Sequence, residues 1–382
     1  CKTMATTAFF RGNKVLWLVL VSLVVLYLWS MSSNHTTGAA RDAEMQRLNQ
    51  NKQPSTSTAR YQHQESYLSY DANSDTYKFA IIADMDKDSK VISGSDVNWV
   101  SSLMTGKLHR NRINGLYTIE WEETIPVRSK LNEGGRGMEL SDLCYFNNML
   151  LTFDDRSGIV FEVNVAMKEV IPRYILADGN GNQSKGFKGE WCAVKGDQLW
   201  IGGLGKEWTT PKGEVVNHDP MWVKTINLNG EIEHHNWESV YNKMRSKVGA
   251  SYPGYIIHEA VAFSTGNADL REPHWFFAPR RISTEPYDDE KDEYRCHNTA
   301  FIFDEDFATS KIKNDVGPFS ATRGFSSVRF VPFREDEFVV LKTEEVDGIS
   351  TYMAIYDVHG KVLMNERKIA SVKYEGFEFL HK

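Results

Sequence analysis

Short apolar runs separated by turn residues follow one another from Tyr77 to the end of the chain. The runs are rich in aromatic and β-branched residues, which favours strands over long helices. Examples are KFAIIADMD (78–86), GLYTIEW (115–121), HWFFAPRR (274–281) and TYMAIYDVHGKVL (351–363). Pairs such as Asn147-Asn148 lie where hairpin turns are expected. The pattern predicts an all-β body, with one helical insertion at 236–249.

Five of the runs carry an oxygen donor near their start. The donors are Ser141 in MELSDLCYF, Glu190 in KGEWCAV, Glu259 in IHEAVAF, Ser326 in GFSSVRF and Glu375 in YEGFEF. They are 49, 69, 67 and 49 positions apart, which suits one four-stranded propeller blade per step. Equivalent residues on the inner strands of a propeller point at one axis, and a set of oxygen ligands favours a hard cation. The sequence therefore predicts a five-bladed β-propeller with a central calcium site, closed by pairing the 78–83 strand with the YEGFEF blade.

The N-terminal part has a different pattern. Residues 15–31 form an apolar run of 17 residues, which is at the short end for crossing a bilayer. Arg11 and Lys14 precede the run and the next basic residue is Arg41, so the positive-inside rule places the N-terminus in the cytoplasm. The alternative is a cleaved signal peptide. The predicted segments are a cytoplasmic tail (1–14), a transmembrane signal-anchor (15–31), a flexible luminal stem (32–76) and the propeller domain (77–382).

This topology leads to expectations about location. A short anchor fits the thinner membranes of the early secretory pathway, so we expect a type II single-pass protein of the Golgi or endoplasmic reticulum, with a cleaved, secreted form as the alternative. Asn34 and Asn182 begin glycosylation triplets. The four cysteines are too few for a disulfide framework. Cys144 and Cys192 lie in apolar runs and are expected to be buried free thiols.

Charge narrows the range of partners. The chain has a formal net charge of −7, with residues 1–70 at +4 and residues 71–382 at −11. An acidic body argues against nucleic acid as a partner. A substrate that carries phosphate would need a bound cation or a cluster of arginines.

Acidic and basic residues beside the donor motifs are candidates for chemistry. Asp84 and Asp86 in IADMDKDS, together with Asp142, could activate a water molecule. Arg136 and Arg156 could hold phosphate oxygens, although an arginine on a turn is often simply exposed. IADMDKDS does not meet the EF-hand pattern, so acids at the solvated end of a strand remain the alternative.

A second group of candidates lies near the predicted blade ends. GGLGKEWT (202–209) lacks the Walker A spacing, but it could direct Lys206, Glu207 and Trp208 into a pocket, with Trp208 stacking on a base. Arg280 and Arg281 are further candidates for phosphate contacts. No GxSxG, HExxH or Cys/His arrangement supports nucleophilic serine or cysteine chemistry.

Eight motifs, in this order, closely resemble those of the soluble calcium-activated nucleotidase (apyrase) family. They are IADMD, GRGMELSDL, DDRSG, KGFKGEW, GGLGKEWT, PGYIIHE, RGFSS and SVKYEGFEF. The family includes a vertebrate Golgi and endoplasmic reticulum enzyme and the salivary apyrases of blood-feeding bugs. The resemblance covers about residues 77–380. It implies a five-bladed propeller with a central calcium ion, held at positions that match the five donors.

The resemblance also implies an activity, the hydrolysis of nucleoside di- and triphosphates. We expect metal-assisted attack of water on a phosphoanhydride, with UDP, GDP and also ADP or ATP as substrates. In the lumen this reaction would support glycosylation by removing UDP. A propeller glycoside hydrolase and a non-enzymatic calcium-dependent binding propeller remain alternatives, and a homodimer is left open.

Overall fold

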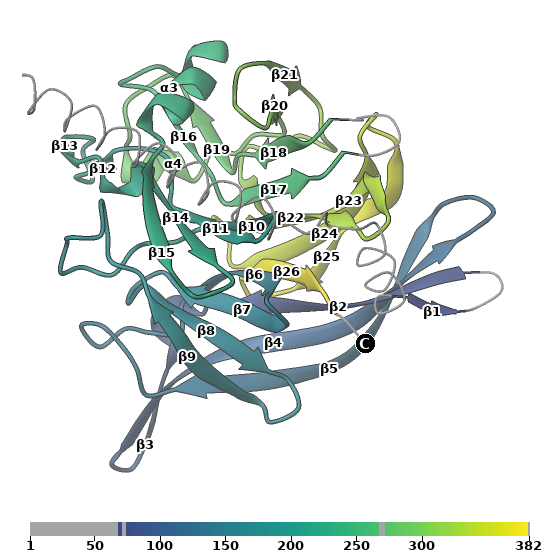
Figure 1. Cartoon of the computed structure of the whole chain (residues 1–382), viewed down its shortest axis with the longest axis horizontal. Helices are drawn as coiled ribbons and strands as arrows, with labels where there is room; N and C mark the ends of the chain where they lie inside the picture. Colours follow the sequence, from purple (N-terminus) through teal and green to yellow (C-terminus); the bar gives the residue numbers. More distant parts are fainter. Residues whose placement is uncertain (1–67, 71–73, 267–271, 381–382) are drawn as a thin grey trace, which may run out of the picture. The chain divides into compact units, whose positions relative to one another are not determined.

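The apolar runs form antiparallel sheets of four strands arranged around a common centre (Figure 1). The computed structural model describes residues 68–70, 74–266 and 272–380, all within one unit, Gln64–Lys382. In this part of the chain no helix is long and apolar enough to cross a bilayer. The predicted anchor at 15–31 and the predicted glycosylation site at Asn34 lie outside the described residues.

Four blades are continuous in sequence. Blade 1 consists of β6 (Leu140–Phe146), β7 (Met149–Asp154), β8 (Ile159–Asn164) and β9 (Glu169–Ile175). Blade 2 consists of β10 (Trp191–Lys195), β11 (Gln198–Gly202), β14 (Trp222–Asn227) and β15 (Ile232–Asn236). Blade 3 consists of β17 (Ala260–Ser264), β18 (His274–Ala278), β20 (Ala300–Asp304) and β21 (Ser310–Lys313). Blade 4 consists of β22 (Arg323–Val331), β23 (Arg334–Glu344), β24 (Ser350–Asp357) and β25 (Val362–Ala370).

Blade 5 joins the two ends of the described chain. It consists of β26 (Tyr374–Phe379), β2 (Ser74–Ala83), β4 (Asp96–Asn111) and β5 (Tyr117–Ser129), and is extended by β1 (Leu68–Tyr70) and β3 (Lys90–Ser93). Strands β2 and β26 pair antiparallel, with Ile81 opposite Phe377. The closure predicted for the 78–83 strand is therefore confirmed.

The innermost strands form a closed ring. Around the centre the order is β6, β10, β17, β22 and β26, and β26 again lies beside β6 (Figure 1). Each neighbouring pair of blades encloses one buried apolar cluster. Because each blade is covered on both faces by its neighbours, the strands near its centre are almost continuously apolar, as in β18 (His274–Ala278). The predicted five-bladed propeller is confirmed.

Insertions between strands build one end of the propeller. Hairpin β12–β13 (Trp208–Thr209 and Val215–Asn217) and the short helix η2 (Asp219–Met221) follow β11, and helix α3 (Glu238–Lys247) follows β15. Strands β16 (Tyr255–Ile257) and β19 (Arg281–Ser283) pair beside blade 3, near the short helix α4 (Asp289–Asp292). Helix η1 (Asp86–Ser89) follows β2. The helix predicted for 236–249 is thus confirmed as α3, between blades 2 and 3.

Candidate active site and calcium centre

The five predicted donors lie at the same end of the five inner strands. Glu190 and Glu259 immediately precede β10 and β17. Ser141 and Glu375 are each the second residue of their strand, and Ser326 lies near the start of β22. Each of the five is at most 8% exposed. The ring therefore brings one oxygen-bearing side chain per blade toward a shared centre.

β-Bulges direct three of these donors away from the strand ladder. In β26, Tyr374 lies opposite Ala83 and Gly376 lies opposite Ile82, so Glu375 is the extra residue. Similar register shifts occur at Ser326 in β22 and at Ser141 in β6. A bulge leaves one residue unpaired and changes the direction of its side chain. The same distortion thus recurs at the donor position of three separate blades.

A cavity of about 730 Å³ opens at this end of the propeller. Its lining includes eleven of the residues predicted from sequence: Asp84, Asp86, Arg136, Arg156, Glu190, Lys206, Trp208, Glu259, Arg280, Arg281 and Glu375. Four predicted residues are not part of the lining: Ser141, Asp142, Glu207 and Ser326. The Ser326 hydroxyl instead donates to the Tyr374 carbonyl at 3.4 Å.

The three glutamates that line the cavity, Glu190, Glu259 and Glu375, interact electrostatically. The pKa of Glu190 is raised to about 7, chiefly by burial; Lys188 opposes this shift, and the charge of Glu259 adds to it. Burial also raises the pKa of Glu375 well above its usual range. Arg280 contacts both Glu259 and Glu375, the latter at 2.9 Å. The three buried carboxylates line one cavity, and oxygen donors of this kind are the ligands that calcium prefers.

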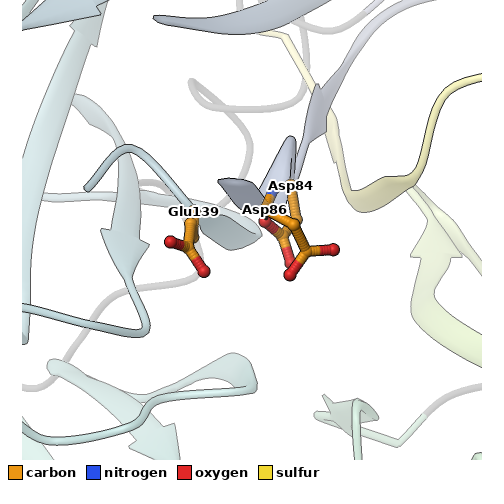
Figure 2. Close-up of side chains that lie close together, drawn as sticks. All are labelled: Asp84, Asp86 and Glu139. Atoms are coloured by element: carbon orange, nitrogen blue, oxygen red, sulfur yellow. Dashed lines mark hydrogen bonds between the residues drawn. The ribbon is translucent and has the colours of Figure 1, made fainter. Parts of the chain in front are cut away.

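Asp84, Asp86 and Glu139 form a second acidic group in the cavity. Each offers an oxygen within 4.8 Å of the others, and Figure 2 shows their side chains close together. Arg136 pairs with Glu139, and Lys373 pairs with Asp84 at 2.8 Å and with Asp86 at 3.4 Å. These two cations already offset much of the acidic charge. The carboxylate oxygens of the group could hold a cation or orient a water molecule.

The geometry gives Asp142 a structural position. It is fully buried, pairs with Arg329 at 2.9 Å, and accepts hydrogen bonds from the Cys192 amide at 3.0 Å and the Ser327 hydroxyl at 3.1 Å. Burial raises its pKa, and the charge of Arg329 opposes that shift. These contacts tie blade 1 to blades 2 and 4. Its place outside the cavity gives no support to a role in activating water.

Glu207 also lies outside the cavity. It pairs with Arg245 of α3 at 2.6 Å and fixes the helix to the loop after β11. Its two neighbours do line the cavity: the Lys206 ammonium lies 4.1 Å from the centre of the Tyr287 ring, and Trp208 lies under the Lys185 ammonium at 4.8 Å. Aromatic rings at this side of the cavity could stack on a planar base.

Comparison with known proteins shows the family of this chain. A family model described as Apyrase matches residues 85–380. The chain is 43% identical over 307 residues to "Soluble calcium-activated nucleotidase 1" of Rattus norvegicus, covering 80% of this chain and 74% of that protein. The chain belongs to the apyrase family. It is also 42% identical over 309 residues to "Apyrase" of Cimex lectularius, covering 80% of this chain and 82% of that protein.

More distant likenesses add little. The chain is 38% identical over 316 residues to "Apyrase apy-1" of Caenorhabditis elegans, covering 81% of this chain and 86% of that protein. A solved structure of cobalt-substituted Synechocystis ACO aligns over 79% of this chain and 64% of that chain, at 9% identity and a TM-score of 0.29. That likeness is too low to support any statement about this apyrase.

Several residues of the cavity were missed by the sequence reasoning, among them Glu139, Lys188 and Lys373. Each lies two positions before a predicted donor, in ELS (139–141), KGE (188–190) and KYE (373–375). Extended backbone places residues i and i+2 on the same side. The recurring charged residue at i−2 was therefore a signal that could have found them in this apyrase.

Proposed function

We propose that this apyrase is a calcium-dependent hydrolase that converts nucleoside di- and triphosphates to monophosphates and phosphate. The observation that supports this proposal most is the cavity in which three buried glutamates from different blades meet a set of arginines and lysines. Related proteins are named calcium-activated nucleotidase and apyrase. Ser141, Glu190, Glu259, Ser326 and Glu375 would hold the calcium, which when bound supplies positive charge to offset the charge on the phosphate oxygens.

The arginines of the cavity would orient the phosphate chain. Arg136 and Arg156 come from blade 1, and Arg280 and Arg281 come from the segment beside blade 3. Guanidinium groups bind phosphate oxygens through two parallel hydrogen bonds, which fixes the direction of the chain. Two arginine pairs from different blades suit a substrate with more than one phosphate.

Asp86 is the best placed of the predicted acids to accept a proton from water. It lines the cavity and its side chain is 46% exposed, whereas Asp84 is buried and accepts a hydrogen bond from the Asp86 amide at 2.8 Å. Burial and the charge of Asp84 raise the pKa of Asp86, which makes its carboxylate a stronger base. Asp84 would then act by holding Asp86 and Lys373 in place.

The deciding experiment is phosphate release from UDP, GDP, ADP and ATP, first with calcium and then with chelator. We expect release that needs calcium and stops at the monophosphate. The absence of release from all four nucleotides would contradict the proposal. In that case, sugar release from a glycan panel would indicate the glycoside hydrolase, and calcium binding without turnover would indicate a binding propeller.

We also propose that residues 15–31 anchor the protein in the Golgi or endoplasmic reticulum membrane, with the propeller in the lumen. Asn182 supports this topology because it lies on an exposed loop between β9 and β10, where a glycosyl transfer enzyme could reach it. Luminal hydrolysis would remove the UDP left by glycosyltransferases. After expression in cells, treatment with a glycosidase should lower the apparent mass of the protein. In intact microsomes the propeller should be protected from added protease.

A further inference from the structure

Two lysines in the cavity have matching surroundings. Lys188 precedes β10, and Lys373 precedes β26. Each is two residues before a predicted calcium ligand and contacts it: Lys188 contacts Glu190 at 2.8 Å, and Lys373 contacts Glu375 at 3.4 Å. Both ammonium groups thus form an ion pair with a carboxylate of the predicted metal site.

Each lysine is also held by an aspartate on its other side. The Lys188 ammonium pairs with Asp155 of the β7–β8 turn, and the Lys373 ammonium pairs with Asp84 at 2.8 Å. Such a pair of carboxylates fixes the ammonium in space before any substrate arrives. The lysines are therefore positioned groups of the cavity and differ from flexible surface charges.

The two lysines flank blade 1. In the ring of inner strands, β10 and β26 are the two neighbours of β6. Arg136, just before β6, and Arg156, on the turn after β7, also line the cavity. In the order of the inner strands, these four cations come from blades 5, 1 and 2.

We propose that Lys188 and Lys373 bind the phosphate chain of the substrate beside the calcium, as positioning residues on the two blades next to blade 1. The inference rests on the proposed function. Each lysine weakens the binding of calcium and strengthens the binding of phosphate. An ammonium beside Glu190 or Glu375 repels a divalent cation held by the same carboxylates, but attracts a phosphate that bridges toward that cation.

This opposition gives a sharp test in Lys188→Met and Lys373→Met. Calcium affinity is measured by isothermal titration calorimetry, and nucleotide affinity is measured in saturating calcium with a methylene-bridged analogue of UDP that cannot be hydrolysed. We expect each variant to bind calcium about tenfold more tightly and the analogue at least about tenfold more weakly. Lys188→Arg keeps the charge and should bind both ligands within about threefold of the wild type.

Lys342→Met is the matched control. Lys342 is a buried lysine that pairs with Glu366 at 3.0 Å and does not line the cavity, so its loss should leave both affinities unchanged. If both affinities fall in the Lys188 and Lys373 variants, the lysines only support the glutamates and the inference is wrong. If the variants bind the analogue as well as the wild type does, the phosphate role is wrong, while the proposed function stands. Failure of the wild type itself to bind the analogue would contradict the proposed function and the inference with it.

Discussion

Glu190 has the properties expected of a calcium ligand. It is 5% exposed, it immediately precedes an inner strand, and the charge of Glu259 acts on it. Replacement by Gln keeps its size but removes one ligand charge, and calcium affinity depends on the number of charged ligands. We expect Glu190→Gln to lower calcium affinity about a hundredfold, with a matching loss of phosphate release at low calcium.

Calorimetric titration of calcium into Glu190→Gln and the wild type checks this expectation. Glu366→Gln is a suitable control because the Glu366 side chain is only 6% exposed and pairs with Arg323, but lies outside the cavity. Normal calcium affinity together with full activity in Glu190→Gln would show that the metal site has been assigned to the wrong residues.

Asp154 should make the stability of the fold depend on pH. It is fully buried and accepts hydrogen bonds from the Met138 and Arg156 amides, both at 2.9 Å. Burial raises its pKa to about 6, which the nearby charge of Asp155 also favours and the two amides oppose. Between about pH 4 and pH 6 the folded state therefore holds more protons than the unfolded state. The stability that the neutral carboxyl contributes is present below pH 4 and is lost as the pH rises through 6.

The test compares the wild type with Asp154→Asn, which cannot titrate. At each pH, the free energy of unfolding of the variant is subtracted from that of the wild type. This difference should fall by about 2–3 kcal/mol between pH 4 and pH 7. Urea unfolding at several pH values and constant calcium measures this difference. A difference that stays constant with pH would mean that Asp154 keeps an ordinary pKa.

Single residues also show what the sequence could and could not reveal about the site. The glutamate donors could be found because they recur at blade spacing. The spacing could not separate Asp84 from Asp142, since both are acids beside a motif. The structure separates them, because Asp84 lines the cavity whereas Asp142 lies outside it and pairs with Arg329.

At the scale of elements, hairpins and strand order were predictable from local signals. Asn147 and Asn148 both take positive φ, at 50° and 61°, as a two-residue hairpin between β6 and β7 requires. The bulges at Ser326 and Glu375 were not predictable, because a register shift depends on the partner strand and leaves no mark in the bulged strand alone. The sequence therefore predicted the blades correctly but did not predict the β-bulges that direct the donor side chains.

Close approach of β26 to β6 gives a prediction about one glycine. A Cβ atom on Gly376 would lie 2.6 Å from the Asp142 carbonyl carbon and 2.7 Å from the Ile82 side chain. Backbone atoms cannot move away cheaply, so Gly376→Ala should lower the free energy of unfolding by about 2–3 kcal/mol. Urea unfolding in chelator measures this loss without a contribution from calcium.

Gly196→Ala separates crowding from conformational cost. Gly196 lies in the β10–β11 hairpin with φ of 59°, and a Cβ atom there would meet nothing within 4 Å. Its replacement should cost only about 1 kcal/mol, from the left-handed backbone. Equal losses in the two variants would show that β26 and β6 are not tightly packed.

At the scale of the whole molecule, the fold and the site depend on one another. Five repeats could be read from the sequence because each blade contributes one inner strand with one donor. The cations that balance the donors could not be read in the same way, since Arg280 comes from after β18 and yet contacts Glu375 of blade 5. Such contacts between blades exist only once the ring has closed.

Ring closure leads to the last prediction, that calcium stabilises the entire propeller. The proposed ligands come from all five inner strands, so calcium can bind them together only in the folded ring. A ligand that binds only the folded state adds about 2.7 kcal/mol to the free energy of unfolding at one hundred times its dissociation constant. We expect the thermal midpoint of the wild type to rise with calcium. It should rise less with magnesium, because magnesium demands a small octahedral site. The midpoint of Glu190→Gln should stay unchanged over the same calcium range. Thermal unfolding in chelator, calcium and magnesium measures all three shifts, and an equal response of Glu190→Gln and the wild type would place the stabilising calcium elsewhere in the protein.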